Sequence, residues 1–190
     1  MKIFFATSNK HKFLEAKNIL EKYGINIKMY PFKPIEIQSN SIEEIVKNCA
    51  KQIIERKIKK KIFLEDSGLF IKSLKNFPGA YSSYVYSTIG LNGILKLMEN
   101  EKNRDAIFKS AIAFINEKNK IKIFTGIVRG RIAYIPKGGK GFGFDPIFIP
   151  LGYNKTFAEM SIEEKNRISH RGKAIIKMYN WIKKYYKINQ

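Results

Sequence analysis

The sequence predicts an α/β fold in which an elongated mixed sheet with flanking helices forms two lobes around a central cleft. Residues 1–190 are expected to form a single domain, because 44% hydrophobic and 27% charged residues are typical of one globular unit with a buried core. Strand-like and helix-like patterns alternate at the start of the chain, which favours partly parallel strands. A later stretch of period-two alternation predicts a long antiparallel hairpin that extends the sheet.

The N-terminal elements follow from apolar spacing and from the residues that bound them. The predicted segments are a strand at 2–6, a helix between 13 and 23, a strand at 25–29, a helix that begins at 41 and a buried strand at 62–64. Gly24 is placed to end the first helix. Ser41 and Glu44 have the spacing of a capping box at the start of the second. We expect the third strand to end abruptly at Glu65.

The C-terminal elements begin after a Pro78-Gly79 turn. The predicted segments are mixed helical structure at 81–99, strands at 106–115 and 121–135 joined by a turn at 116–120, a glycine-rich loop at 136–143, a short strand at 147–149 and helices from 161 onward. Ser169 is placed to cap the last helix.

The charge balance indicates an anionic partner. The chain carries 36 Lys and Arg against 16 Asp and Glu, a net charge of +20 that attracts nucleotides, nucleic acids or acidic membranes. The lysines are scattered, which is more typical of a solvated face than of a nucleic-acid patch. No window approaches the roughly 18 uninterrupted apolar residues of a membrane span, and no signal-peptide core follows Met1. We therefore expect a cytoplasmic protein with no membrane partner and no stable nucleic-acid partner.

Three carboxylates form a candidate metal site. One cysteine and two histidines exclude an internal disulfide and a four-ligand zinc site, so any metal is a hard, oxygen-bound one. Glu36, Glu65 and Asp66 supply oxygen ligands, and the last two are predicted at the C-terminal end of a strand, where open α/β sheets bind ligands. In a basic protein this favours Mg²⁺ shared with a phosphate. A surface turn is the alternative interpretation of Glu65 and Asp66.

A small polar loop between the first strand and the first helix is a candidate phosphate site. It consists of Thr7, Ser8, Asn9, Lys10, His11 and Lys12. Backbone N–H groups at a helix start, with the helix dipole, favour an anion there. An ordinary helix cap with solvated lysines is the alternative.

The glycine-rich loop and the last helix supply further candidates. Gly141 stands where a Walker A loop needs Ser or Thr, and no helix follows as in a dinucleotide fingerprint, so both of those nucleotide motifs are excluded. Phe142, Gly143, Phe144 and Asp145 present two aromatic rings and an acceptor, a suitable wall for a purine. Lys165, His170 and Arg171 form the last cluster, although a His-Arg pair at a helix start is normally exposed.

Taken together, the motifs resemble those of the inosine triphosphate pyrophosphatases of the Ham1 type. The matching segments, in family order, are Thr7-Ser8-Asn9-x-x-Lys12, Glu65-Asp66-Ser67-Gly68-Leu69, Pro78-Gly79-Ala80-Tyr81-Ser82, Phe142-Gly143-Phe144-Asp145-Pro146-Ile147-Phe148, and Thr156-Phe157-Ala158-Glu159-Met160 leading to Lys165 and Ser169-His170-Arg171. The resemblance implies an elongated fold with a central nucleotide-binding cleft, Mg²⁺-dependent hydrolysis of ITP, dITP and XTP to the monophosphate and pyrophosphate, and a homodimer.

The resemblance also implies roles for individual residues. Residues 7–12 form the triphosphate loop, Glu36 and Asp66 hold the metal, Glu65 either supports these ligands or is an additional one, and Asp66 accepts the proton of the attacking water. Ser67 touches the substrate, Lys47 faces the phosphates, Phe142 to Asp145 and Lys165 hold the nucleoside, and His170 and Arg171 read the base.

The chemistry is coherent without the family name. Phosphoanhydride cleavage needs charge neutralisation and an aligned water. Arginine only donates hydrogen bonds, so Arg171 satisfies a 6-oxo purine and finds no acceptor in the 6-amino group of adenine. Two alternatives stay open: a Maf-type nucleotide pyrophosphatase, and a basic nucleic-acid-binding protein, which the charge and the 13% aromatic content motivate.

Overall fold

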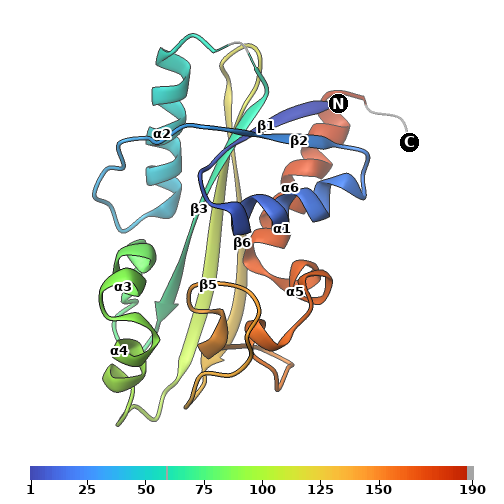
Figure 1. The fold of residues 1–190 in the computed structure, drawn as a ribbon. Coiled ribbons are helices and arrows are strands. Elements are labelled where there is room, and N and C mark those ends of the chain that lie inside the picture. The colour runs from blue at the N-terminus through green and yellow to red at the C-terminus, as the bar shows by residue number, and fades with distance from the viewer. Residues whose placement is uncertain (59, 188–190) are drawn as a thin grey trace.

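A mixed sheet runs along an elongated molecule, and helices cover both of its faces (Figure 1). The structure is a computed structural model that describes residues 1–58 and 60–187. Its strands are β1 (Lys2–Ala6), β2 (Asn26–Tyr30), β3 (Ile62–Ile71), β4 (Pro78–Gly79), β5 (Asp105–Ile115), β6 (Ile121–Ile132) and β7 (Phe148–Pro150). Its α-helices are α1 (Lys10–Glu21), α2 (Ile42–Glu55), α3 (Ser82–Thr88), α4 (Gly90–Leu97), α5 (Ile162–Ile168) and α6 (His170–Tyr185), with 3-10 turns η1 (Asp145–Ile147) and η2 (Phe157–Glu159).

The sheet order is β2-β1-β3-β5-β6-β7, with β4 paired to β3. β1 is parallel to β2 and β3, and the other pairs are antiparallel. The β5–β6 hairpin is paired from Asp105–Arg131 to Ile115–Ile121. The structure therefore confirms the predicted α/β class, an elongated mixed sheet with flanking helices.

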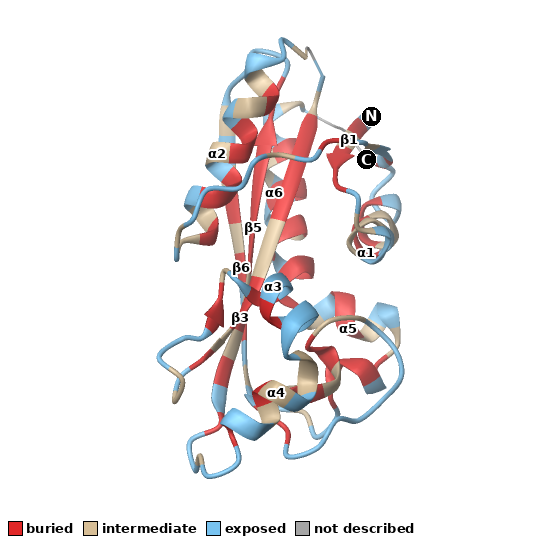
Figure 2. Cartoon of the chain, turned by 60° about the vertical axis from the view of Figure 1, so that its left-hand side comes forward, coloured by how far each residue is buried: buried red, intermediate tan, exposed pale blue. Residues whose placement is uncertain are grey.

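The two faces of the sheet carry separate hydrophobic cores. Helices α1 and α6 pack on one face around Phe5, Phe63 and Phe114, and α2 packs on the other face around Leu64 and Ala113 (Figure 2). A third core, near α3, α4 and η2, fills the opposite end of the sheet from the β1–β2 pair. Within the described residues, no helix is long and apolar enough to cross a membrane.

The predicted helix starts are confirmed. Ser41, Ser161 and Ser169 each accept a hydrogen bond from a backbone N–H in the first turn of α2, α5 and α6. These caps satisfy donors that a helix leaves unpaired.

The predicted end of the third strand is wrong. β3 does not stop at Glu65 but runs for ten residues from Ile62 to Ile71, with its full length paired to β5. Glu65 and Asp66 therefore lie in the middle of a strand. The backbone ladder to β5 carries the strand through this polar segment, although its side chains interrupt the apolar run.

Candidate active site

The site lies on an open stretch of one edge of β3. β1 pairs with β3 only as far as Phe63, and β4 begins pairing at Leu69. Between them, residues 64–68 have β5 as their strand partner on one side. The carboxylates Glu65 and Asp66 thus stand just past the C-terminal end of the parallel part of the sheet, where α/β proteins bind ligands.

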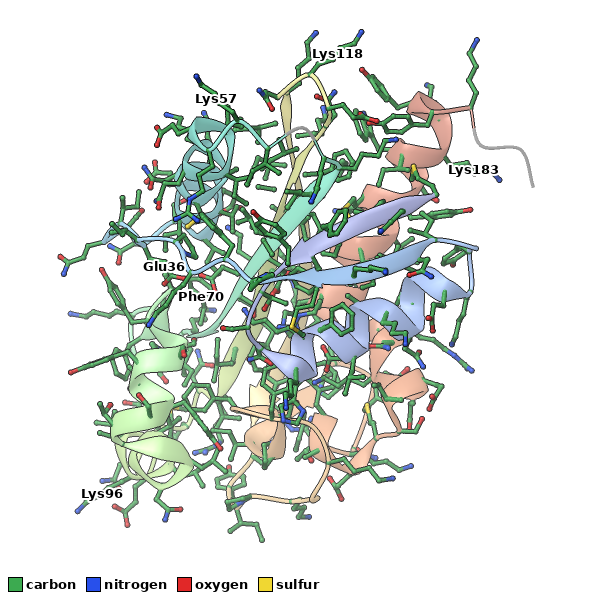
Figure 3. The ribbon with its side chains drawn as sticks, turned by 45° about the horizontal axis from the view of Figure 1, so that its top comes forward. Glu36, Lys57, Phe70, Lys96, Lys118 and Lys183 are labelled. Atoms are coloured by element: carbon green, nitrogen blue, oxygen red, sulfur yellow. The ribbon has the colours of Figure 1, made fainter. Side chains whose placement is uncertain are left out.

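Glu65 and Asp66 point to opposite faces, because side chains alternate along a strand. Asp66 lies two residues after Leu64 and so shares the face that α2 covers. Glu36 lies on the loop that leads into α2 (Figure 3). Partial removal from water and the charge of Asp66 raise the pKa of Glu36. Burial also raises the pKa of Asp66, while the nearby Lys12 ammonium opposes that rise. The charge of Asp66 therefore acts on Glu36 from the same side of the sheet.

Glu65, which was predicted as a further metal ligand, is turned away from this pair. Ser110 Oγ donates to Glu65 Oε1 at 2.7 Å, and Arg171 Nε lies 3.2 Å from the same oxygen. Lys12 Nζ lies 3.0 Å from Glu65 Oε2. Burial alone would raise the pKa of Glu65, but the charges of Arg171 and Lys12 outweigh it and hold the pKa far below its usual range. Glu65 is a fixed anion in a salt-bridge network, an arrangement that favours a supporting role beside the metal carboxylates over direct ligation.

Lys12 crosses the open edge and contacts both carboxylates. Its Nζ lies 3.6 Å from Asp66 Oδ1 in addition to the contact with Glu65. The backbone N–H of Lys12 donates to Asn9 Oδ1 at 3.0 Å, and the N–H of Asn9 donates to Thr7 Oγ1 at 3.1 Å. The loop is thus a true helix cap, as the alternative interpretation held, and it also brings a cation to the carboxylates.

The rest of the predicted phosphate loop is accessible to a ligand. Ser8, Lys10 and His11 are exposed at the start of α1. The first N–H groups of a helix have no partner within it, so this end can bind an anion. Lys47 is exposed on α2 and stands outside the network around Glu65.

A buried chain of alternating charges continues from Glu65 toward α5. Arg171 donates from Nη1 to Glu15 and from Nη2 to Ser67 Oγ at 2.9 Å. Lys165 Nζ lies 2.7 Å from Glu15 Oε1 and 2.6 Å from Asp145 Oδ2. We call this the ion chain: in order, it consists of Asp145, Lys165, Glu15, Arg171, Glu65, Lys12 and Asp66. It links η1, α5, α1, α6 and β3.

Glu15 is the site residue that sequence reasoning missed. It is buried on α1 beside Ala16 and one turn before Ile19, on the apolar face of the helix. A carboxylate at an apolar position is the signal that marks it, because an unpaired buried charge is too costly to keep. Burial would raise the pKa of Glu15, but Arg171 and Lys165 lower it, so it is charged.

Only one of the two predicted aromatic rings borders the ion chain. Phe142 is half-buried, stacks on His11 with ring centroids 5.3 Å apart, and lies within 5.3 Å of Arg171 Cζ. Phe144 is buried in the third core, near α3, α4 and η2, and meets Tyr86 edge-on, so its predicted place in the purine wall is corrected. The carboxylate of Asp145 is already hydrogen-bonded within the protein. It accepts from the backbone N–H of Phe142 at 2.8 Å and from Lys165 Nζ.

The bend of this loop depends on glycine. Gly143 adopts a left-handed φ of 59° between the two rings. A side chain at Gly141, where φ is 76°, would lie 2.3 Å from Asp145 Oδ2, the atom that holds Phe142 and Lys165.

His170 and Arg171 are buried, not exposed as a His-Arg pair at a helix start normally is. The His170 ring stacks on Phe108 at 4.6 Å, and its Nδ1 is buried without a hydrogen-bond partner. Burial and the charge of Arg171 lower the pKa of His170 well below 6.5, so the ring is neutral. Arg171 keeps N–H groups beyond those that its partners use, because a guanidinium has five.

The donor set suits Mg²⁺ better than a metal that needs a full protein cage. Within residues 1–58 and 60–187, no group of three or more His, Cys, Asp or Glu side chains is arranged to hold a metal ion. Two carboxylates, Glu36 and Asp66, remain on one face. Mg²⁺ typically takes one or two carboxylates and completes its shell with waters and substrate phosphates, so these residues fit it.

Comparison with known proteins shows the family of this chain. The family model described as the Ham1 family matches residues 3–181. This chain belongs to the Ham1 family. It is 51% identical to the dITP/XTP pyrophosphatase of Thermococcus kodakarensis, over 96% of this chain and 98% of that protein. The dITP/XTP pyrophosphatase of Pyrococcus horikoshii is also 51% identical, with 96% and 97% covered.

Solved Ham1 structures share the fold. The Staphylococcus aureus Ham1 protein superposes with a TM-score of 0.83 at 28% identity, over 97% of this chain and 100% of that chain. The Coxiella burnetii HAM1 protein gives the same TM-score and identity, with 97% and 99% covered. The Ham1 resemblance seen in the sequence motifs is therefore confirmed.

Proposed function

We propose that residues 1–190 form one nucleoside-triphosphate pyrophosphatase domain that hydrolyses the non-canonical purine nucleotides ITP, dITP and XTP to the monophosphate and pyrophosphate. The observation that carries this proposal is the open edge of β3. There Asp66, Glu36 and Lys12 meet beside the start of α1. Likeness to dITP/XTP pyrophosphatases over nearly the whole chain supports the same reaction.

The phosphates bind at the start of α1. Lys12 is held at the carboxylates by its contacts with Glu65 and Asp66, while the exposed Lys10 and the helix N-terminus add positive potential. Ser8, Asn9 and the rest of residues 7–12 line this region. Lys47 adds a further cation from α2. Fixed positive charge around the triphosphate stabilises the charge that develops during phosphoryl transfer.

Glu36 and Asp66 hold Mg²⁺ in this proposal. When bound, the ion neutralises phosphate charge and polarises the bond that breaks. Asp66 also accepts the proton of the attacking water, and its raised pKa suits a general base better than that of an ordinary aspartate. No nucleophilic side chain is required.

The base binds beside Arg171, which is next to Glu65 in the ion chain. Phe142 offers a flat ring face beside Arg171, and Ser67 presents its hydroxyl next to that guanidinium. Arg171 and His170 read the 6-oxo edge of the purine. Glu15, Lys165 and Asp145 hold Arg171 and the Phe142 loop in place, so Lys165 supports the nucleoside site through its ion pairs.

In this proposal the protein acts in the cytoplasm as a homodimer. It has no membrane partner and no stable nucleic-acid partner. The +20 charge serves to attract the polyanionic substrate.

A release assay tests this function. The protein is incubated with Mg²⁺ and, separately, ITP, dITP, XTP, GTP, ATP, CTP and UTP, and pyrophosphate and orthophosphate are measured. We expect pyrophosphate from ITP, dITP and XTP at a rate at least tenfold above that from ATP, CTP and UTP. Orthophosphate as the product, or a preference for pyrimidine triphosphates as a Maf-type enzyme would show, overturns the proposal.

A further inference from the structure

Glu36 lies on a segment without regular secondary structure, whereas Asp66 is carried by a strand. Residues 31–41, between β2 and α2, contain neither helix nor strand, and Figure 3 labels Glu36 on this segment. Apolar packing does not hold the segment at Glu36, because the neighbouring Ile35 is 82% exposed and Ile37 is 39% exposed. The position of a carboxylate proposed to bind a metal must therefore be fixed in another way.

One side chain of α2 holds the backbone directly before Glu36. Gln52 Oε1 accepts from the backbone N–H of Ile35 at 3.0 Å, and Gln52 Nε2 donates to the backbone carbonyl of Ile35 at 2.6 Å. Within the described residues, these are the only hydrogen bonds that the backbone of residues 33–38 makes. We call this pair of bonds the Gln52 clamp. It uses both polar groups of one residue, as a neighbouring antiparallel strand would.

The amide of Gln52 is itself held in place. Its Nε2 also donates to Asn48 Oδ1 at 3.0 Å, one turn earlier on α2. An amide nitrogen carries two N–H groups, so Ile35 and Asn48 use both of them. Gln52 is therefore fixed on its own helix while it binds the loop.

α2 is in turn attached to the sheet that carries Asp66. Lys109 Nζ on β5 lies 2.6 Å from Glu43 Oε1 and donates to Glu43 Oε2 at 2.8 Å, in the first turn of α2. Lys109 is paired with Gly68 of β3, two residues after Asp66. The inner side of α2 packs in the same core as Leu64. Contacts thus run without a break from Ile35 through α2 and β5 to the strand of Asp66.

The loop has other anchors, so the clamp is not needed merely to attach it. Phe32 is buried in the core with α2, and Ser39 Oγ donates to Glu44 Oε2 at 2.8 Å. These contacts hold the two ends of the loop. The clamp acts between them, at the residue next to Glu36.

Charge and coordination give the clamp a purpose. The charge of Asp66 acts on Glu36, and repulsion between the two carboxylates would drive a free loop outward when no cation lies between them. Mg²⁺ requires near-ideal octahedral geometry, so a displaced ligand binds it poorly. We propose that Gln52 is a positioning residue whose clamp on Ile35 keeps Glu36 within reach of a metal ion that Asp66 also binds. The inference rests on the metal site proposed above.

Gln52→Met tests the clamp, because methionine has a similar length and can make neither bond. Gln38→Met is the matched control, since it makes the same change at an exposed position two residues after Glu36. Binding of Mn²⁺, as a substitute for Mg²⁺, is measured by electron paramagnetic resonance with and without inorganic pyrophosphate. The Mg²⁺ concentration for half-maximal pyrophosphate release from ITP is measured separately. Circular dichroism checks that each variant is folded.

We expect Gln52→Met to weaken Mn²⁺ binding and to raise the Mg²⁺ requirement by about three- to thirtyfold, because the loop must be ordered again when the metal binds. The rate at saturating Mg²⁺ should stay within about twofold of wild type, and Gln38→Met should match wild type in both measurements. When Glu36→Gln is already present, Gln52→Met should not change the Mg²⁺ requirement further, because the clamp acts through that carboxylate.

Three results would overturn the positioning role: unchanged Mn²⁺ binding in folded Gln52→Met, an equal loss in Gln38→Met, or full additivity with Glu36→Gln. Absence of Mn²⁺ binding to wild type in both conditions overturns it as well, together with the metal site. Wild type that binds Mn²⁺ but releases no pyrophosphate from ITP overturns the proposed function alone, and Mn²⁺ binding by the variants still decides whether Gln52 positions Glu36.

Discussion

Replacing Glu15 by glutamine tests whether the ion chain holds the site together. Glutamine keeps the shape of the side chain but removes the charge that Lys165 and Arg171 share. Both cations are nearly inaccessible to water, with side-chain exposed fractions of 4% and 2%. The change therefore leaves two buried positive charges with one fewer carboxylate between them.

The expected loss of stability follows from what each cation retains. Removing one partner of a buried ion pair costs about 3–5 kcal/mol. Lys165 keeps Asp145, and Arg171 keeps Glu65 and Ser67, so the lower end of that range applies. For a chain of this size, about 3 kcal/mol corresponds to a fall in Tm of roughly 6–12 °C.

Thermal unfolding by circular dichroism at neutral pH measures the effect. Glu21→Gln is the control, because Glu21 lies on the same helix and pairs with Lys17 at 3.6 Å with both side chains exposed. An exposed pair contributes about 0–1 kcal/mol, so its Tm should move by no more than about 4 °C. If Glu15→Gln melts within 2 °C of wild type, the ion chain does not hold these elements together.

The effect of Glu15→Gln on Tm is also expected to depend on pH. The pKa of Glu15 in the folded protein lies below its ordinary value of 4.5, so its contribution is fully present above pH 4.5 and is lost as the pH falls from there through the folded pKa. The Tm difference between wild type and Glu15→Gln should therefore shrink as the buffer is acidified below pH 4.5. A difference that grows in acid would show that Glu15 is not a stabilised anion.

Three other substitutions separate the parts of the site, and a fourth, with its control, tests the close approach of β3 and β4. Asp66→Asn should lower turnover of ITP on the order of 10²–10⁴-fold with the fold intact, and half of wild-type activity at saturating Mg²⁺ would remove Asp66 from the mechanism. Glu36→Gln should mainly raise the Mg²⁺ concentration needed for half-maximal rate, and an unchanged titration would make it an ordinary loop residue. Arg171→Ala should lower the ratio of ITP to ATP efficiency by about 10–200-fold, measured at a temperature where the variant is folded, and an equal loss on both nucleotides would show that Arg171 does not read the base. Gly68→Ala should destabilise the protein, because a Cβ there would lie 2.1 Å from Gly79 O, whereas Gly139→Ala meets nothing within 4 Å and should be neutral.

The sequence predicts the elements whose hydrophobic residues recur with a clear period. Its predictions fail where polar residues interrupt that period. The hairpin and the serine caps were predictable because period-two alternation and capping spacings are local signals. β3 was predicted too short because Glu65 and Asp66 end its apolar run, while the pairing that extends it comes from β5. Local patterns do not show such pairing.

The same difference between local and long-range signals applies to the candidate site. Lys12 and Asp66 could be proposed from their own motifs, but the burial of Arg171 depends on partners far away in the chain. Ser67 is 104 residues from Arg171, and Glu15 is 156. A local pattern contains no information on such contacts, so the usual exposure of a His-Arg pair was a poor guide here. Phe144 was misplaced for a related reason, since its core neighbours lie outside its loop.

The ion chain is better explained by ligand binding than by stability. Well-packed apolar residues in place of a buried ionic network are often neutral or more stable by about 1–4 kcal/mol. Folding alone therefore gives no reason to bury Asp145, Lys165, Glu15, Arg171 and Glu65 in a row. A nucleoside triphosphate supplies one, because its base needs fixed donors and its phosphates need fixed cations. The alternation of charge lets the protein hold Arg171 and Lys12 on either side of Glu65 without an unpaired ion between them, so in the proposed site the base and the phosphates meet groups that are already in place.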